Sequence, residues 1–127
     1  MRIKQLLIGM TASVIAVSSY VEMAIADLKF PMLVYRTGAY APNGIPNADG
    51  FVDYYKMINA RDGGIGGEKI VHPECETGYK TQVGVECYEK NKKDAMVFQP
   101  MSTGITSQLI PKATADGVTI YSTGYGR

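Results

Sequence analysis

Residues 31–36 have the sequence Pro-Met-Leu-Val-Tyr-Arg, a short apolar run that a Thr-Gly pair follows. An apolar run of this length that ends in a turn predicts a buried β-strand entering a loop. The loop is expected over residues 38–44, which are rich in turn-forming residues. A helix is then expected to begin near Ile45 and Pro46, because the missing N–H of a proline has no partner to lose in a first helical turn.

The predicted helix presents one apolar stripe and ends at a glycine-rich segment. The stripe, which recurs at helical spacing, consists of Phe51, Tyr54, Tyr55 and Ile58. Residues 59–67 (NARDGGIGG) stop the helix, since their glycines supply the positive-φ positions of a C-cap and a tight turn. A second short strand follows at residues 69–72, and Pro73 ends it.

The rest of the chain continues the same alternation. It predicts a helix over residues 81–91, a strand over 95–99, a helix capped by Thr106 or Ser107, and a strand over 118–121. Pro111 should kink or shorten the third helix. Strands and helices in alternation predict an α/β fold, a three-layer doubly wound parallel sheet with helices on both faces. The last strand has no covering helix, which indicates an incomplete lobe of a longer protein.

The first 26 residues have the three parts of a secretory signal peptide. Arg2 and Lys4 give a positive start, residues 6–17 are uncharged and mostly apolar, and Ala24-Ile25-Ala26 offers a small-x-small cleavage site. The alternative is a stable N-terminal helix or membrane anchor, but the apolar run is shorter than the roughly 20 residues that a bilayer span needs. We therefore expect residues 27–127 to form an exported domain.

Charge and cysteine content narrow the classes of protein further. Thirteen basic residues nearly balance twelve acidic ones, which argues against a nucleic-acid partner. The two cysteines, Cys75 and Cys87, can form a disulfide in an oxidising compartment. The alternative, a buried thiol on the apolar side of the second helix, stays open. No second Cys or His pair accompanies them, so a zinc site is not expected.

Three predicted loops should meet at one edge of the sheet. They are residues 37–44, 101–106 and 122–127, each after the carboxyl end of a strand, where doubly wound sheets bind ligands. Each loop mixes glycine with hydroxyl or amide side chains, so the edge offers hydrogen-bond donors rather than acids and bases. A helix N-terminus near Thr103 adds a positive dipole end. This combination suits the capture of a carboxylate or a carbonyl.

Catalytic alternatives find little support in the sequence. His72 is the single histidine, and Glu74 and Glu76 are expected to be solvated acids in a turn. No GxSxG motif is present. The glycines of residues 63–67 follow a helix and lack the Lys-Ser/Thr ending of a phosphate loop. No cofactor is expected. The tyrosines expected to lie in the core are Tyr54, Tyr55 and Tyr88.

A set of short motifs connects the chain to a known family. Asn59-Ala60 runs into a Gly-Gly-Ile-x-Gly-x-Lys segment that ends at Lys69, and Thr37-Gly38, Gly44, Gly50, Cys75-Glu76 and residues 103–106 match as well. With these motifs, residues 33–127 resemble the first lobe of type I periplasmic binding proteins, specifically the leucine/isoleucine/valine-binding group. Members of that group bind branched-chain amino acids, short amides and urea.

The resemblance implies a set of ligand-binding residues. A hydroxyl after the third strand would hold the ligand's carboxylate, and the loop after the fourth strand would contact the ligand through its backbone. A side chain just before the first helix would border the pocket. The positions implied here are Asn43, Ser102, Thr103, Gly104, Gly124, Tyr125 and Gly126.

The chain also departs from the family pattern. Relatives often pair a cysteine after the second strand with one in the loop after the third, but that loop here holds Met101 and Ser102. A disulfide in this chain would therefore have to use Cys87. The family's second lobe, which closes over the ligand, is not part of the sequence, and Pro111 is foreign to the third helix.

The function that these features predict is solute capture for an ABC importer. The solute would be a branched-chain amino acid or a related amide or urea-like molecule, the partner an ABC permease, and the location the periplasm. An exported sensory module of the same fold and an α/β enzyme fragment are the alternatives. The enzyme would need a nucleophile–base pair or a phosphate loop, which the sequence lacks.

Overall fold

The structure is a computed structural model that describes residues 26–123. All of the predicted signal peptide except Ala26 lies outside the described residues, and so do the predicted ligand contacts Gly124, Tyr125 and Gly126. None of the helices within residues 26–123 is long and apolar enough to cross a lipid bilayer.

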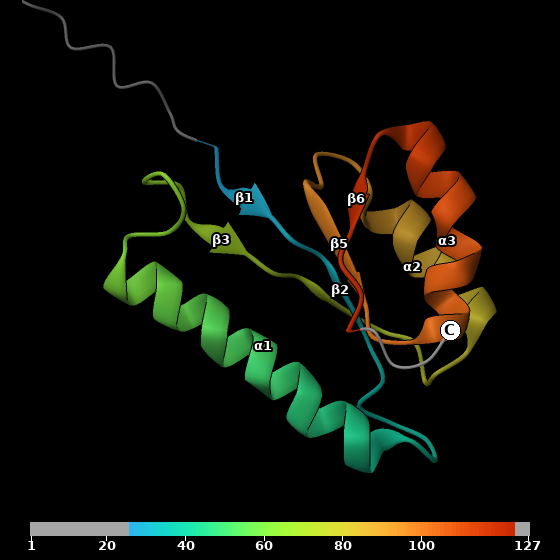
Figure 1. The fold of residues 1–127 in the computed structure, drawn as a ribbon. Helices are drawn as coiled ribbons and strands as arrows, with labels where there is room; N and C mark the ends of the chain where they lie inside the picture. Colours follow the sequence, from blue (N-terminus) through green and yellow to red (C-terminus); the bar gives the residue numbers. More distant parts are fainter. Residues whose placement is uncertain (1–25, 124–127) are drawn as a thin grey trace, which may run out of the picture.

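The strands form a parallel sheet at the centre of the molecule (Figure 1). The main sheet has the order β4-β2-β5-β6, and a shorter pair joins β1 to β3. The bounds are β1 Leu28–Lys29, β2 Met32–Val34, β3 Ile70–Val71, β4 Glu74–Glu76, β5 Val97–Pro100 and β6 Thr119–Ile120. Every pairing between these strands is parallel, as the sequence predicted.

Two prolines interrupt the pairing of two long parallel segments, residues 28–34 and 70–76. Pro31 separates β1 from β2, and Pro73 separates β3 from β4. Leu28 pairs with Ile70 and Met32 with Glu74, so the same offset holds on both sides of the prolines. Regular strand hydrogen bonding is interrupted there because a proline has no N–H to donate to the ladder.

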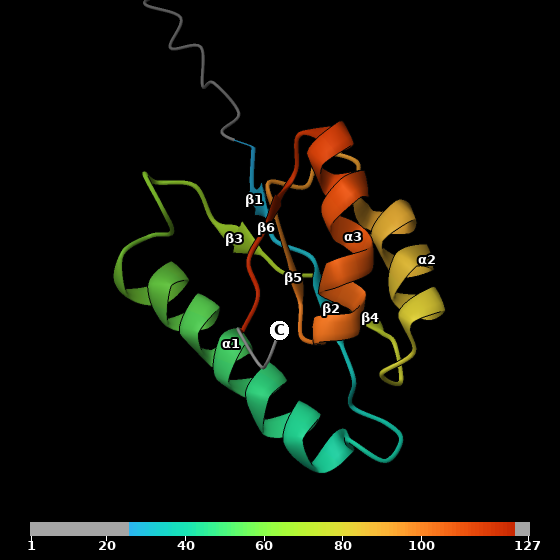
Figure 2. The same ribbon diagram turned by 45° about the vertical axis from the view of Figure 1, so that its right-hand side comes forward.

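Within residues 26–123, three helices cover the two faces of the sheet (Figures 1 and 2). Helix α1 (Ala41–Arg61) lies on one face, and α2 (Thr81–Asn91) and α3 (Thr103–Asp116) pack together on the other. The predicted fold class, a three-layer doubly wound α/β sheet, is confirmed. The predicted span of α2 is also confirmed.

The beginning of α1 differs from the prediction. The helix starts at Ala41 rather than near Ile45, so half of the expected loop is helical and Pro42 occupies the first turn. Pro46 lies inside the helix, at an exposed position. Gly44 is buried against Tyr35, whose carbonyl oxygen and ring leave no space for a Cβ atom. The close approach of helix and strand, rather than a loop, explains this glycine.

Three further boundaries need correction. Residues 74–76 form strand β4 rather than a turn, and they pair with β2. Helix α3 begins at Thr103 with Ser102 as its N-cap, so neither Thr106 nor Ser107 caps it. Pro111 does not shorten α3, which continues to Asp116. Pro111 is exposed, so water can reach the backbone groups around it.

The core has two halves because β2 alternates its side chains between the faces. Met32 and Val34 pack under α1, whereas Leu33 packs under α2 and α3. Tyr55 and Tyr88 are buried in these two halves, as predicted. Tyr54 was expected in the core as well, but it is 55% exposed. The prediction was wrong because adjacent side chains of a helix point in different directions, and of this pair only Tyr55 is on the side that faces the sheet.

Candidate functional site

The carboxyl ends of β2, β4, β5 and β6 lie at the same edge of the sheet, since all the pairings are parallel. The chain leaves β2 toward α1 on one face and leaves β5 toward α3 on the other. Because β2 and β5 are neighbours, their loops diverge and leave a crevice between them. The described parts of the three loops expected at this edge are all found there.

An open cleft of about 570 Å³ lies at this point of divergence. Tyr79 lines the cleft and contacts two other tyrosines: its ring centroid lies 4.8 Å from that of Tyr35 and 4.4 Å from that of Tyr40. Tyr35 is buried beneath, whereas Tyr40 and Tyr79 are partly exposed. We call these three residues the tyrosine wall. The other residues that line the cleft are Asn43, Pro46, Asn47 and Met101.

Two amides from α1 line the cleft together with the tyrosine wall. They are Asn43 and Asn47, which are one helical turn apart. The side-chain nitrogen of Asn47 is buried but has no hydrogen-bond partner among residues 26–123. Buried polar groups nearly always have a partner, so this nitrogen is an available donor for an acceptor in the cleft.

A second hollow of about 430 Å³ continues along α1. It shares Pro46 and Asn47 with the cleft and extends to Phe51, Tyr54 and Tyr121. Beneath it, burial raises the pKa of Tyr55 to about 12, with a smaller effect of nearby Tyr121. The Tyr55 hydroxyl stays protonated at neutral pH, so it can donate its hydrogen bond to the Gln99 carbonyl oxygen at 3.1 Å.

Glu74 and Glu76 were expected to be solvated, but both accept hydrogen bonds from Arg36. The Arg36 guanidinium donates bidentate hydrogen bonds to the Glu74 carboxylate at 2.6 and 2.9 Å and a further one to Asp49 on α1 at 2.7 Å. These hydrogen bonds, first to Glu74 and then to Asp49, raise the pKa of Arg36. The cluster joins β4, the segment after β2 and α1, and so fixes these three elements to one another.

The sequence of residues 27–126 matches the profile of the periplasmic binding protein family. The chain belongs to the periplasmic binding protein family. The match covers nearly the whole of the described chain, including every residue that lines the cleft. The family is one of binding proteins rather than enzymes, as the sequence predicted.

Solved structures of similar proteins agree with this family. A protein from the Pseudomonas fluorescens group, described as an ABC transporter permease, is 39% identical, with a TM-score of 0.73 over 80% of this chain and 26% of its own. A fatty acid ABC transporter substrate-binding protein from Thermomonospora curvata is 22% identical, with a TM-score of 0.71, covering 77% of this chain and 25% of its own.

A third structure is that of LivJ from Streptococcus pneumoniae, a branched-chain amino acid transporter substrate-binding protein in complex with isoleucine. It is 22% identical, with a TM-score of 0.67, covering 76% of this chain and 28% of its own. The chain thus spans about a quarter of the length of the periplasmic binding proteins that it matches. No curated protein matches the chain.

In this periplasmic binding protein lobe, one predicted ligand residue lines the cleft, and three others directly follow Met101, which also lines it. Asn43 lines the cleft directly. Ser102 is buried, and its hydroxyl accepts a hydrogen bond of 3.5 Å from the Ile105 N–H at the start of α3. Thr103 and Gly104 follow Ser102 in the first turn of α3, with Gly104 exposed. Met101, the residue before them, is the nearest one that reaches the cleft.

The tyrosine wall and Asn47 were missed by the sequence analysis. A signal for this edge exists in the sequence, because its four Thr-Gly pairs each come shortly after a strand. They are residues 37–38, 77–78, 103–104 and 123–124. Gly38 and Gly78 have positive φ and so allow tight turns at this edge. A tyrosine follows within two residues of three of the four pairs.

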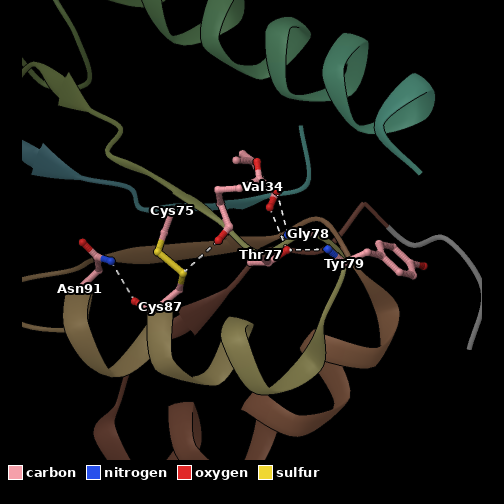
Figure 3. Close-up of a disulfide and its surroundings, with 8 residues drawn as sticks. Val34, Cys75, Thr77, Gly78, Tyr79, Cys87 and Asn91 are labelled. Carbon is pink, nitrogen blue, oxygen red and sulfur yellow. Dashed lines mark hydrogen bonds between the residues drawn. A yellow bond between two sulfur atoms is a disulfide. The ribbon is translucent and has the colours of Figure 1, made fainter. Parts of the chain in front are cut away.

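The alternative chemistries gain no support from the described chain. His72 packs its ring 5.6 Å from that of Tyr55, away from the tyrosine wall. Within residues 26–123, no group of three His, Cys, Asp or Glu residues could hold a metal ion. Cys75 and Cys87 form a disulfide, which decides between the two alternatives that the sequence left open (Figure 3).

Proposed function

We propose that this chain provides one wall of the solute-binding site of an ABC importer. The observation that carries the proposal is the open cleft at the point where β2 and β5 diverge, which the tyrosine wall and two amides line together. Aromatic faces with a few directed polar groups are typical of small-molecule sites.

The proposed solute is a branched-chain amino acid or a related amide or urea-like molecule. All seven residues that line the cleft are uncharged, so this wall favours contact with the apolar body and the hydrogen-bonding end of a solute. The Asn47 side-chain nitrogen would donate to a carboxylate or carbonyl oxygen. Ser102, Thr103 and Gly104, with residues 124–126, would border the same end of the solute from the sheet edge.

Capture would require a second lobe that closes over the solute, followed by delivery to an ABC permease. Hinge closure of this kind needs no bond chemistry. The chain spans about a quarter of its structural relatives, so the rest of the site would come from sequence beyond this lobe. Residues 1–26 would direct export to the periplasm, and the disulfide suits that oxidising compartment.

The proposal can be tested by isothermal titration calorimetry of this lobe expressed together with the second lobe. The panel is isoleucine, leucine, valine, acetamide and urea. We expect at least one to bind, and we expect Asn47→Leu to weaken that binding about tenfold, the loss of one hydrogen bond to a charged acceptor. Gln108→Leu is the matched control, since it removes an exposed amide on α3 outside the cleft.

Two outcomes would contradict the proposal. A folded protein that binds no member of the panel would exclude these solutes. Equal binding by Asn47→Leu and wild type would move the solute away from the cleft.

A further inference from the structure

The central residue of the tyrosine wall has an unusual backbone conformation. Tyr79 has a φ of +64°, in the left-handed region that bulky residues rarely adopt. Gly78 before it also has positive φ, at +54°. The conformation brings the Tyr79 ring between those of Tyr35 and Tyr40. Such a conformation persists only where surrounding contacts hold it in place.

Part of the support comes from Thr77, which is buried below the turn (Figure 3). Its hydroxyl donates a hydrogen bond to the Val34 carbonyl oxygen at 2.8 Å and accepts one from the Tyr79 N–H at 3.2 Å. Its own N–H donates to the same Val34 oxygen. Thr77 thereby fixes the base of the turn to the end of β2.

The Glu76 carboxylate connects the turn to the segment that follows β2. One carboxylate oxygen accepts hydrogen bonds from the Gly78 N–H at 2.7 Å and the Thr37 hydroxyl at 3.1 Å. The other oxygen accepts from the Arg36 N–H at 2.7 Å. A single carboxylate therefore joins both segments that carry the tyrosine wall, since Tyr35 precedes Arg36 and Tyr79 follows Gly78.

The charges around Glu76 are arranged so that its carboxylate is available for these bonds. The Arg36 guanidinium, just after β2, donates its hydrogen bonds to Glu74 on β4 and Asp49 on α1. On the side of α2, the nearest ionisable residues along the chain are Lys80 and Glu86, and Glu86 accepts a hydrogen bond from Gln82.

Burial acts to raise the pKa of Glu76. The N–H groups of Arg36 and Gly78 and the Thr37 hydroxyl outweigh it and hold that pKa below its ordinary value. The carboxylate is therefore charged at neutral pH and accepts all three hydrogen bonds there.

We propose that Glu76 is the positioning residue of the cleft: its carboxylate holds Tyr79 against Tyr35 and Tyr40 and so builds the wall on which the solute rests. The placement of Tyr79 is a property of the chain alone, and only its importance for binding rests on the proposed function. Glutamine in place of Glu76 would present one oxygen and an NH2 group, so at least one backbone N–H would face another donor.

The test is nuclear Overhauser contact between the ring of Tyr79 and those of Tyr35 and Tyr40, measured without ligand in wild type, Glu76→Gln and Glu74→Gln. We expect the contacts to be lost in Glu76→Gln. Glu74→Gln is the matched control, because it removes the same charge two residues away on the same strand but leaves the turn's hydrogen bonds in place. Amide shifts of α2 report that each variant is folded.

An acid titration of wild type supplies a second measurement should Glu76→Gln fail to fold. A pKa below the ordinary value means that the bonds are complete at neutral pH and are lost as pH falls through the folded-state pKa, under about 4.5. The ring contacts should therefore disappear in that acid range. Contacts that persist in folded Glu76→Gln and throughout the acid range, or that Glu74→Gln abolishes equally, would overturn the proposal.

Isoleucine titration then separates the positioning role from the proposed function. If isoleucine binds wild type, Glu76→Gln should bind it about tenfold more weakly, while Glu74→Gln should match wild type. Loss of the ring contacts in Glu76→Gln, with no isoleucine binding by either protein, would uphold the positioning role and count against the proposed solute.

Discussion

The two faces of the sheet differ in how completely they are packed and hydrogen-bonded. On the α2/α3 face, Gly84 lets the helices approach so closely that a Cβ there would lie 2.6 Å from Ile105. Lys92 bonds both Glu89 and Asp116, and the Tyr88 hydroxyl donates to Asp116 at 2.9 Å. Side chains from both helices thus close this face.

On the α1 face, polar groups remain without partners. The buried side-chain nitrogens that lack a hydrogen bond in residues 26–123 belong to Asn47, His72 and Gln99. All three lie on the side of α1, since Asn47 is part of that helix and both other residues contact Tyr55. Hollows occur on both faces, two along α1 and one of about 450 Å³ between α2 and α3. What separates the faces is therefore the unpaired donors: the α2/α3 face is the more completely hydrogen-bonded, and the α1 face retains donors for further contacts.

The largest expected effect tests the packing of the α2/α3 face. Leu109 is fully buried on α3, and its neighbour Ile110 is 56% exposed. Leu109→Ala should lower the free energy of unfolding by about 2–5 kcal/mol, because it leaves a cavity in a closely packed core. Ile110→Ala should change it by less than about 0.5 kcal/mol. Urea denaturation of both variants measures the difference, and similar losses would contradict the assignment of this face as the stable one.

The second expected effect concerns the covalent link on the same face. The Cys75–Cys87 disulfide ties β4 to α2 over a separation of 12 residues. Replacing both cysteines with alanine should cost about 3 kcal/mol, mainly by freeing the unfolded chain. Urea denaturation of the double variant gives the value. Wild type treated with a reducing agent is the control, and no loss in either case would show that α2 packs without the link.

The smallest expected effect lies on the α1 face. Gln99 is 1% exposed, and among the described residues its side-chain nitrogen has no partner, whereas its oxygen accepts a hydrogen bond from Tyr55. Gln99→Met removes an unsatisfied donor and one acceptor together, so the free energy of unfolding should change by less than about 1 kcal/mol. A loss as large as that of Leu109→Ala in the same denaturation series would show that the α1 face is as tightly determined as the other.

The sequence predicted the fold well where local sequence patterns and long-range contacts favour the same helix or strand boundaries. Helix α2 was placed correctly because its apolar stripe and its flanking turns coincide. The beginning of α1 was misplaced because Pro42 and Pro46 are both suited to a first helical turn, and the contact of Gly44 with Tyr35 that favours the earlier start is not local. The charged residues of β4 resemble a turn until their partner strand is known.

The cleft was predicted less completely, because it is assembled from segments far apart in the chain. Asn43 was identified through the resemblance and does line the cleft. Tyr79 is placed through Glu76, which accepts a hydrogen bond from the Thr37 hydroxyl, and through Thr77, which donates one to the Val34 carbonyl oxygen; these partners are about 40 residues away in the chain. No periodicity in the sequence reports such bonds, so a tyrosine in this turn looks like any other loop residue.

The opposed prolines of the sheet have a consequence for how the strands align during folding. Pro31 and Pro73 occupy matching places in the ladder, where the Pro73 carbonyl accepts from the Met32 N–H and the Pro31 carbonyl accepts from the Gln99 N–H. Each proline leaves one donor place of the ladder empty, and in the observed alignment the two prolines lie opposite each other. A slip of one residue would turn every side chain of the strand to the opposite face, so the alignment that places Tyr35 beside Thr77 is the one that keeps Met32 and Leu33 in their two halves of the core.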